Sequence, residues 1–396
     1  MNERFNLLLP EVRANPYPMY AEMRRTSPVC QVEPGGLWVA ARYKDVAFIL
    51  KNPEIFSSAG FQALLKPAWL GHNPLGDSIL VMDPPAHTKL RGLMSRAFSP
   101  RNLPRMELRV RALADELADR LETLGEADLM AEFAEPLPAR MIGEILGLDA
   151  SLHRSFKKWG GHLAAITPVT PDEELATAIR TSISDMERYL REVLEARRRE
   201  PGDDMVSDLV RAEIDGAALS DAEIIAFLFL LLPAGFETTT NLIANTMLTL
   251  LDHPDAFARV RADRALIPAF IEEVLRYDAP VHGVLRLTTT DVELGGVTVP
   301  AGSMIVCLLG SANRDENQFP DPDRFDLERE SQGGTAFGQG IHFCLGVILA
   351  RMEGRIGLEA LLSRFQGFSR LPGSIAWNQA LTVRGPTTLP IRFHSA

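Results

Sequence analysis

The sequence has few cysteines, no long apolar run and no excess of basic residues, and each shortage excludes a class of protein. Three cysteines among 396 residues do not make the disulfide framework of a small secreted protein. The longest apolar run, residues 224–235, is shorter than the roughly 18 residues that indicate a membrane span. The formal net charge of -11 disfavours nucleic acid, whose phosphates need a basic surface. We therefore expect neither a membrane nor nucleic acid as a partner.

Other signals are missing as well. The first residues carry one charge of each sign and a short leucine run before Pro10, which is not the pattern of a secretory leader. The chain has no Ser/Gly/Pro-rich linker, no repeat period, no G-x-G-x-x-G fingerprint and no P-loop. We predict a single domain over residues 1–396, in the reducing environment of the cytoplasm.

Amphipathic helical patterns fill most of the chain. With 46% hydrophobic and 23% charged residues, the composition is that of an ordinary globular protein. Apolar residues recur at helical spacing, and prolines or capping residues stand at several starts. The patterns predict helices over residues 16–28, 45–50, 103–124, 135–146, 151–163, 173–199, 220–252, 269–277 and 345–362, and another that starts within 83–91.

Short runs of β-forming residues separate these helices, so the predicted fold class is mainly α with small β-sheets. Residues 57–82 contain Gly, Pro and Asn with scattered apolar residues, which predicts a long loop. The two-proline connector 167–171 is a candidate mobile lid. The strands are predicted at 29–32 and 37–40 as a hairpin, at 284–287, 297–299 and 304–308, and at 381–385 and 389–391 as a second hairpin.

Cys344 stands in an unusual setting. It follows a loop that contains Gly338 and Gly340, residues that permit sharp turns, and it precedes the predicted helix 345–362. A thiol at a helix N-terminus lies near unsatisfied N–H groups and the positive end of the dipole, which favours the thiolate. Cys344 is therefore a candidate ligand or nucleophile, whereas Cys30 and Cys307 are interpreted as inert side chains.

Three chemistries are conceivable for this thiol. A Cys/His hydrolase is disfavoured because His342 shares one tight loop with Cys344, no oxyanion-hole pattern is visible, and Phe337 and Phe343 flank the thiol. A zinc site is weaker, since no second Cys or His stands at a ligand spacing. A single thiolate in an apolar, glycine-shaped loop suits a metal that brings its other ligands, namely haem iron.

The stretch Phe-x-x-Gly-x-x-x-Cys-x-Gly over residues 337–346, followed by Leu349-Ala350-Arg351, resembles the haem-binding signature of the cytochrome P-450 family. The resemblance extends from about residue 15 to the end of the chain. It implies the cytochrome P-450 fold, a helical haem domain with small β-sheets, and haem b as the cofactor. Cys344 would be the axial ligand, and Phe337 and Gly338 would form the cofactor-binding loop.

The resemblance also implies which basic side chains hold the haem propionates. His87 and Arg91 are four residues apart, so they share one helix face. Taken alone, two such residues on a helix more often form a surface pair. Their resemblance to the family's His-x-x-x-Arg motif instead favours a role in binding an anionic propionate. Arg286 and His342 match two further propionate ligands.

The predicted helix 220–252 starts with a capping box, Ser220-x-x-Glu223, and contains Pro233-Ala-Gly-Phe-Glu-Thr-Thr239. Pro, Gly and Thr here predict a local distortion, and a simple kink is one interpretation. The run also resembles the family's oxygen-binding groove. Small Ala234 and Gly235 would leave room for O2, Thr238 would steady the activated oxygen, and Glu237 would relay protons to it.

The remaining site predictions also follow from the resemblance. Glu273 and Arg276 match the structural Glu-x-x-Arg motif, with Arg324 as the expected basic partner. As local chemistry, this pair on an exposed helix is worth only ~0.2 to 0.5 kcal/mol. The candidate substrate contacts are Val281, Val284, Leu285, Leu381 and Thr382.

By this resemblance the protein would hydroxylate or epoxidise a bulky apolar substrate with O2: a macrolide or other polyketide, a terpenoid, a steroid or a fatty acid. Electrons would come from NAD(P)H through a ferredoxin reductase and a two-iron or similar ferredoxin. Basic residues cluster over 89–111, with Glu107 as the one acid; this is either a solvated face or a docking patch for that acidic partner. A peroxide-driven haem-thiolate peroxygenase and a non-catalytic haem sensor remain the alternatives.

Overall fold

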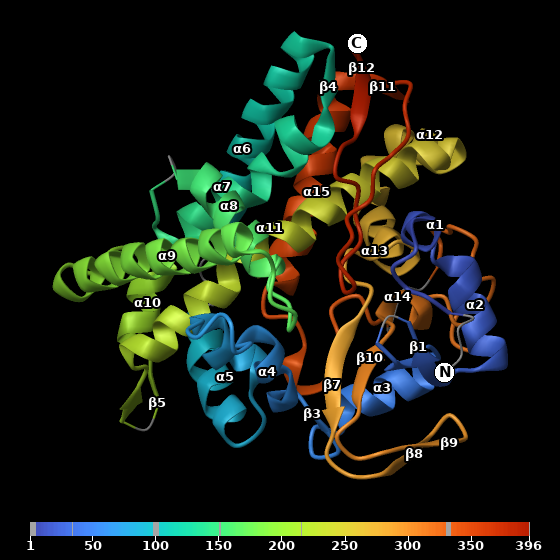
Figure 1. Ribbon diagram of the computed structural model, residues 1–396. Helices are drawn as coiled ribbons and strands as arrows, with labels where there is room; N and C mark the ends of the chain where they lie inside the picture. Colours follow the sequence, from blue (N-terminus) through green and yellow to red (C-terminus); the bar gives the residue numbers. More distant parts are fainter. Residues whose placement is uncertain are drawn as a thin grey trace. The chain divides into compact units, whose positions relative to one another are not determined.

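The computed structural model (Figure 1) describes residues 5–33, 35–97, 103–149, 152–214, 216–329 and 334–395. The chain divides into two compact units: unit 1 comprises Met1–Phe56, Val110–Leu137 and Thr238–Ala396, and unit 2 comprises Ser57–Arg109 and Pro138–Glu237. The single domain over residues 1–396 stays a prediction. Three helices contribute residues to both units: α6 (Leu103–Leu124), α7 (Pro136–Leu146) and α11 (Asp221–Asp252).

Unit 1 is built mainly from helices that lie early and late in the chain. Several of them begin with proline, which lacks the N–H group that a first helical turn leaves unsatisfied. Between β4 and α7 the chain forms one π-helical turn, Met130–Ala134. The helices of this unit are α1 (Pro10–Ala14), α2 (Tyr17–Thr26), α3 (Tyr43–Lys51), α12 (Pro254–Ala262), α13 (Ile267–Tyr277), α14 (Leu309–Ala312) and α15 (Val347–Arg364).

A five-stranded sheet has the order β1-β2-β10-β7-β3. Its strands are β1 (Val29–Val32), β2 (Leu37–Ala40), β10 (Met304–Cys307), β7 (Val284–Thr288) and β3 (Phe56–Ser57). The predicted hairpin is confirmed, because β1 and β2 pair antiparallel with Val29 opposite Ala40. β10 joins β2 in parallel and β7 antiparallel, and Figure 1 shows β7 and β10 side by side. β8 (Val292–Leu294) and β9 (Val297–Val299) form a separate hairpin.

The second predicted hairpin is wrong. Residues 381–385 form no strand; instead β12 (Pro390–Ser395) pairs with β11 (Phe365–Arg370) on one side and β4 (Glu126–Asp128) on the other. Val383 makes an isolated antiparallel bridge to Val281. Period-two patterning marks an extended segment but not its partner, so the sequence could not choose between a local and a distant pairing.

The core of unit 1 comprises several apolar clusters. One lies on one face of the five-stranded sheet and includes Val46, Ile49 and Phe56. Another connects α11, α13 and α15 through residues such as Leu242 and Phe270. At Gly354 an added Cβ would lie 3.2 Å from the Leu242 side chain. The absence of a side chain there therefore lets α15 pack closely against α11.

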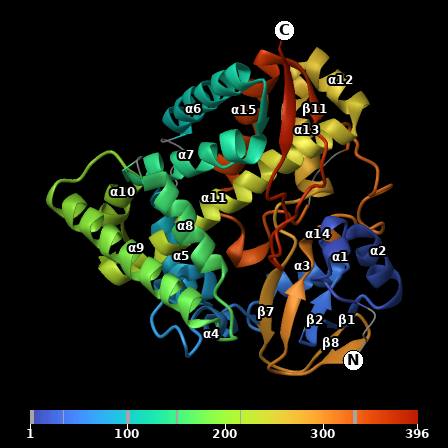
Figure 2. The same cartoon turned by 45° about the horizontal axis from the view of Figure 1, so that its top comes forward.

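Unit 2 is mainly helical. Its helices are α4 (Gln62–Leu65), α5 (Ala86–Ala97), α8 (His153–Ala164), α9 (Glu173–Arg199) and α10 (Met205–Arg211), with the short hairpin β5 (Glu213–Ile214) and β6 (Ala217–Ala218). α9 matches its predicted bounds because its buried residues recur at spacings of three and four. Asp172 caps it by accepting a hydrogen bond from the Leu175 N–H at 2.8 Å. Figure 2 shows α8 lying against α9.

The predicted loop 57–82 is not fully irregular. It contains α4 and three 3₁₀ turns, Ala59–Phe61, Pro74–Asp77 and Ile79–Val81. Two further 3₁₀ turns lie at Arg264–Leu266 and Gly340–His342. The sequence analysis missed α10 and α12, which are only 7 and 9 residues long and so give a weak periodic signal.

α11 begins as its capping box predicts. The Ser220 Oγ accepts a hydrogen bond from the Glu223 N–H at 3.3 Å, and the Glu223 carboxylate accepts one from the Ser220 N–H at 2.7 Å. The helix continues through Pro233 to Asp252. By length and composition alone it could cross a membrane, but half of its most apolar window is buried within the molecule. The core helix of a soluble protein has the same length and composition.

Candidate functional site

The loop before Cys344 has a shape that only glycine provides at two places. Gly338 and Gly340 have φ angles of +71° and +70°, in the region that favours glycine. A Cβ on Gly340 would clash with the carbonyl oxygen of Leu50, at the end of α3. The Cys344 N–H donates to the Phe337 carbonyl at 3.0 Å and closes the loop. The backbone therefore fixes the position of this thiol.

The surface around Cys344 is apolar. The cysteine is exposed, and Phe343 and Ile348 beside it are 41% and 49% exposed. An exposed thiol among exposed aromatic and aliphatic side chains matches the proximal side of a haem, because the macrocycle would cover the apolar groups while the sulfur binds iron. Among the described residues no cluster of three His, Cys, Asp or Glu could hold a metal ion.

The thiol lies close to the start of α15. The helix begins at Val347 with Gly346 as its N-cap, and the Cys344 Sγ is 4.0 Å from where a Cβ on Gly346 would lie. Positive charge at a helix N-terminus stabilises a nearby anion such as a thiolate. On the same helix, Arg351 covers the Phe337 ring at 4.9 Å and pairs with Glu272 through two contacts of 2.5 and 2.8 Å.

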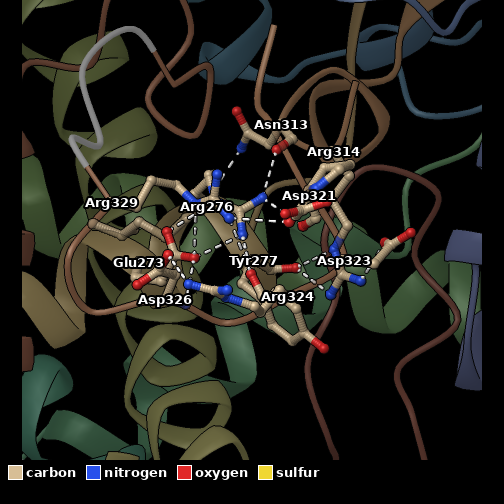
Figure 3. A network of polar contacts seen from close by, with 12 residues as sticks. Glu273, Arg276, Tyr277, Asn313, Arg314, Asp321, Asp323, Arg324, Asp326 and Arg329 are labelled. Carbon is tan, nitrogen blue, oxygen red and sulfur yellow. Dashed lines mark hydrogen bonds and ion pairs between the residues drawn. The ribbon is translucent and has the colours of Figure 1, made fainter. Parts of the chain in front are cut away.

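Glu273 and Arg276 form the centre of a buried network (Figure 3). Arg276 donates to both carboxylate oxygens of Glu273, at 2.7 and 2.8 Å, and both side chains are almost fully buried. The local picture of an exposed pair is therefore wrong. Arg276 also donates to the carbonyls of Asn313 and Pro322, so α13 holds the segment that leads to the Cys344 loop.

The expected basic partner is also corrected. The Arg324 side chain pairs with Asp326, and its carbonyl accepts a hydrogen bond from Arg276. The second guanidinium at Glu273 belongs to Arg329, at 3.2 Å. Both arginines lie in the same polar stretch, and nothing in their sequence context distinguishes them. The sequence therefore missed Arg329.

Two of the predicted propionate ligands belong to unit 1. Arg286 lies on β7, is largely buried, and donates to the Leu285 carbonyl at 2.7 Å. His342 ends the 3₁₀ turn of the Cys344 loop and is partly buried. His87 and Arg91 belong to unit 2, one helical turn apart on α5. Because His87 is buried, it does not belong to a surface ion pair.

Between its exposed ends, α11 is least buried in its middle. Residues 224–229 and 239–250 are buried, whereas Ala234 is exposed and residues 235–238 are partly exposed. Burial raises the pKa of Glu237 above its usual value, so the neutral acid persists to higher pH. A Cβ on Gly235 would lie 3.1 Å from Ile142 of α7, so this glycine also serves the packing of these two helices.

The candidate substrate contacts of unit 1 come together in part. The His282 and Gly283 N–H groups both donate to the Thr382 carbonyl, at 2.8 and 3.1 Å, next to the Val281–Val383 bridge. On β7, however, Val284 and Leu285 point to opposite faces, because side chains alternate along a strand. The prediction that both face one substrate therefore conflicts with the sheet.

Comparisons with known proteins agree with this geometry. A family model described as cytochrome P-450 matches residues 153–371. Cytochrome P-450 107B1 of Saccharopolyspora erythraea is 41% identical over 387 residues, 94% of each chain. The 6-deoxyerythronolide B hydroxylase of the same species is 37% identical over 95% of each chain. The structure of cytochrome P-450 CYP109Q5 from Chondromyces apiculatus gives a TM-score of 0.92 at 41% identity, covering 99% of this chain and 98% of its own.

Proposed function

Because this chain belongs to the cytochrome P-450 family, and is thus a monooxygenase that uses haem and O2, we propose that it hydroxylates or epoxidises a bulky apolar small molecule. The observation that carries this proposal is the Cys344 loop, in which an exposed thiol stands among exposed apolar side chains at the start of a helix. When bound there, haem supplies the O2-activating chemistry that side chains lack.

The chain's own residues would hold the cofactor and supply protons. Cys344 would be the thiolate ligand, and the loop from Phe337 would keep it in place. Arg286 and His342, together with His87 and Arg91, would bind the two propionates. These residues are suited to this because guanidinium and imidazole groups donate hydrogen bonds to carboxylates.

Residues in the middle of α11 would bind O2 and transfer protons to it. Ala234 and Gly235 would leave room for O2, and the Thr238 hydroxyl would hydrogen-bond it. The pKa of Glu237, raised by burial, suits a group that holds a proton more readily than an ordinary carboxyl and releases it during the reaction. The Glu273 and Arg276 pair would act structurally, by holding the segment before the Cys344 loop.

We propose that electrons come from NAD(P)H through a ferredoxin reductase and a two-iron or similar ferredoxin, in the cytoplasm. The basic cluster over 89–111 supports an acidic partner less strongly than its sequence implied, because three of its arginines are already paired. Arg105 pairs with Asp203 and Arg109 with Glu144, and Arg111 pairs with Glu359 at 2.9 Å. Arg101 lies outside the described residues.

The proposed substrate class rests on the apolar candidate contacts and on the similarity to relatives. Val281 and Leu381 are candidate contacts in unit 1, and one relative is named for hydroxylating 6-deoxyerythronolide B. A polyketide or macrolide is the first class to test, followed by terpenoids, steroids and fatty acids.

The test is the absorption spectrum of the dithionite-reduced, haem-loaded protein under carbon monoxide. The wild type should give the red-shifted Soret band of thiolate ligation, and Cys344→Ser should lose it. Product from the substrate panel with the ferredoxin system would then establish turnover. A wild type without this band would refute the assignment of Cys344. Product with peroxide only would identify a peroxygenase, and no product with either oxidant source would favour a haem sensor.

A further inference from the structure

The segment 381–383 lies against residues 280–283 through backbone hydrogen bonds. The Thr382 carbonyl accepts both hydrogen bonds from His282 and Gly283, and the Arg384 N–H donates to the Pro280 carbonyl at 2.8 Å. With the Val281–Val383 bridge, these contacts join two stretches that are about a hundred residues apart. We call residues 381–383 the tip. Its main-chain bonds hold it on one side only.

The other side of the tip is held by the Arg384 side chain. Its Nη1 donates to both carboxylate oxygens of Asp278, at 2.6 and 2.7 Å, and its Nη2 donates to the Ala14 carbonyl at 2.8 Å. The Trp377 ring lies 3.7 Å from the guanidinium carbon. A planar guanidinium whose two terminal nitrogens bind different partners and whose face stacks on an aromatic ring has one orientation, so the residue next to the tip has little freedom.

We call the contact between the Arg384 guanidinium and the Asp278 carboxylate the clamp, and Asp278 is its anion. It lies at the C-terminal end of α13 and accepts a hydrogen bond from the Tyr17 hydroxyl at 2.6 Å. Burial alone would raise its pKa, but the charge of Arg384 and the contacts of His282 and Tyr17 lower it well below the usual range. The Asp278 carboxylate therefore stays charged at every pH of practical interest and holds Arg384.

Two more contacts restrict the same loop. Arg13 of α1 donates to the Val383 carbonyl at 2.6 Å and to the Asn378 side chain at 3.0 Å. At Gly385 any side chain would clash with Asn241 of α11, so the loop touches α11 one turn after Thr238. Contacts at Asn378, Val383 and Gly385 thus restrict the loop around the tip.

We propose that Arg384 is a positioning residue: its clamp on Asp278 sets where the tip stands and so decides which apolar substrates fit. This inference rests on the proposed function, in which the tip contacts substrate. Leu381 and Leu285 are both partly buried and pack against the same apolar cluster of unit 1. A shift of the tip would therefore change the shape offered to a bulky ligand but not the chemistry at the iron.

The structure offers both a matched control and a route for chemical rescue. Arg384 lines a cavity of about 600 Å³ within unit 1, and Arg370 lines the same cavity. Arg370 pairs with Asp252 at 2.6 Å, and both side chains are partly exposed. Arg370→Ala therefore removes a guanidinium from this cavity without touching the tip. The cavity also gives small cations access to the space that Arg384→Ala would leave.

The first measurement needs no turnover. Hydrogen exchange of the segment that contains the His282 and Gly283 amides should speed up by about threefold to thirtyfold in Arg384→Ala, the range expected for a residue that couples two sites. Arg370→Ala should leave it unchanged. Millimolar methylguanidinium should restore slow exchange in Arg384→Ala, and methylammonium at the same concentration should not. If Arg384→Ala does not fold, Arg384→Lys, which keeps the charge but loses the fork, is measured in the same way.

The second measurement uses two haem ligands of different size. The ratio of the dissociation constants of 4-phenylimidazole and imidazole should change by a similar factor in Arg384→Ala, while imidazole binding itself stays as in the wild type. Slow exchange in both Arg384 variants would overturn the clamp. Fast exchange with an unchanged ratio would overturn the link to ligand fit. A wild type that binds neither azole and gives no thiolate band would instead refute the proposed function.

Discussion

Glu353 gives the sharpest quantitative prediction, because it is a carboxyl group in the core of unit 1. It lies on α15, is 1% exposed, and its Oε2 has no hydrogen-bond partner among the described residues. Burial raises its pKa from 4.5 to about 8, since a charged carboxylate loses its hydration in the core. The folded protein therefore holds a proton on Glu353 that the unfolded chain gives up near pH 4.5.

This difference makes stability depend on pH. Below pH 4.5 both states carry the proton, so this group adds no pH-dependent cost to folding. As pH rises towards 8, ionisation stabilises the unfolded state but not the folded state. At about 1.4 kcal/mol per pKa unit, the raised pKa of Glu353 removes ~5 kcal/mol of stability by pH 8. In Glu353→Gln this loss disappears, whereas the cost of burying an amide is the same at every pH.

The assay is unfolding by urea from pH 5 to pH 9, with wild type and variant compared at each pH. The difference in free energy of unfolding should move in favour of Glu353→Gln as pH rises, and level off above about pH 8. Glu359→Gln on the same helix is the control, because that carboxylate pairs with Arg111 and Arg355 at 2.9 Å and its loss should destabilise at neutral pH. Parallel pH profiles for wild type and Glu353→Gln would refute the reasoning.

Three further predictions concern the candidate site. Gly340→Ala should lower the thermal midpoint and haem retention more than Gly338→Ala. Both variants place a side chain at a positive φ, which costs ~1 to 2 kcal/mol for residues other than glycine, but only a Cβ at Gly340 would meet a backbone oxygen. Equal losses would contradict this account. Glu273→Gln should cost ~3 to 5 kcal/mol in unfolding free energy, since it leaves the Arg276 guanidinium buried without its charge partner, and a loss below 1 kcal/mol would show that the network is not needed. Glu237→Gln should slow product formation by roughly 10²-fold with no change in the carbon monoxide spectrum. In the wild type, the rate should fall as pH rises through the raised pKa of Glu237. An unchanged rate in Glu237→Gln would exclude Glu237 as the proton donor.

Local patterns were sufficient wherever one segment decides its own structure. The spacing of apolar residues in α9 and the capping box of α11 fix those helices by contacts within a few residues. The Cys344 loop was also predictable, because its glycines and its thiol lie within ten residues. For the same reason the family signature could be recognised without a structure.

Only the tertiary structure decided which distant segments meet. Residues 381–385 have a strand-like pattern, yet their partner is Val281 rather than residues 389–391. Arg324 and Arg329 are equivalent by composition, but only the fold of the segment around them brings Arg329 to Glu273. The sequence by itself thus determined the long helices and the Cys344 loop, because short-range sterics and hydrogen bonds specify them. The charge partners, the Arg384 clamp and the burial of Glu353 depend on long-range packing, which no local pattern encodes.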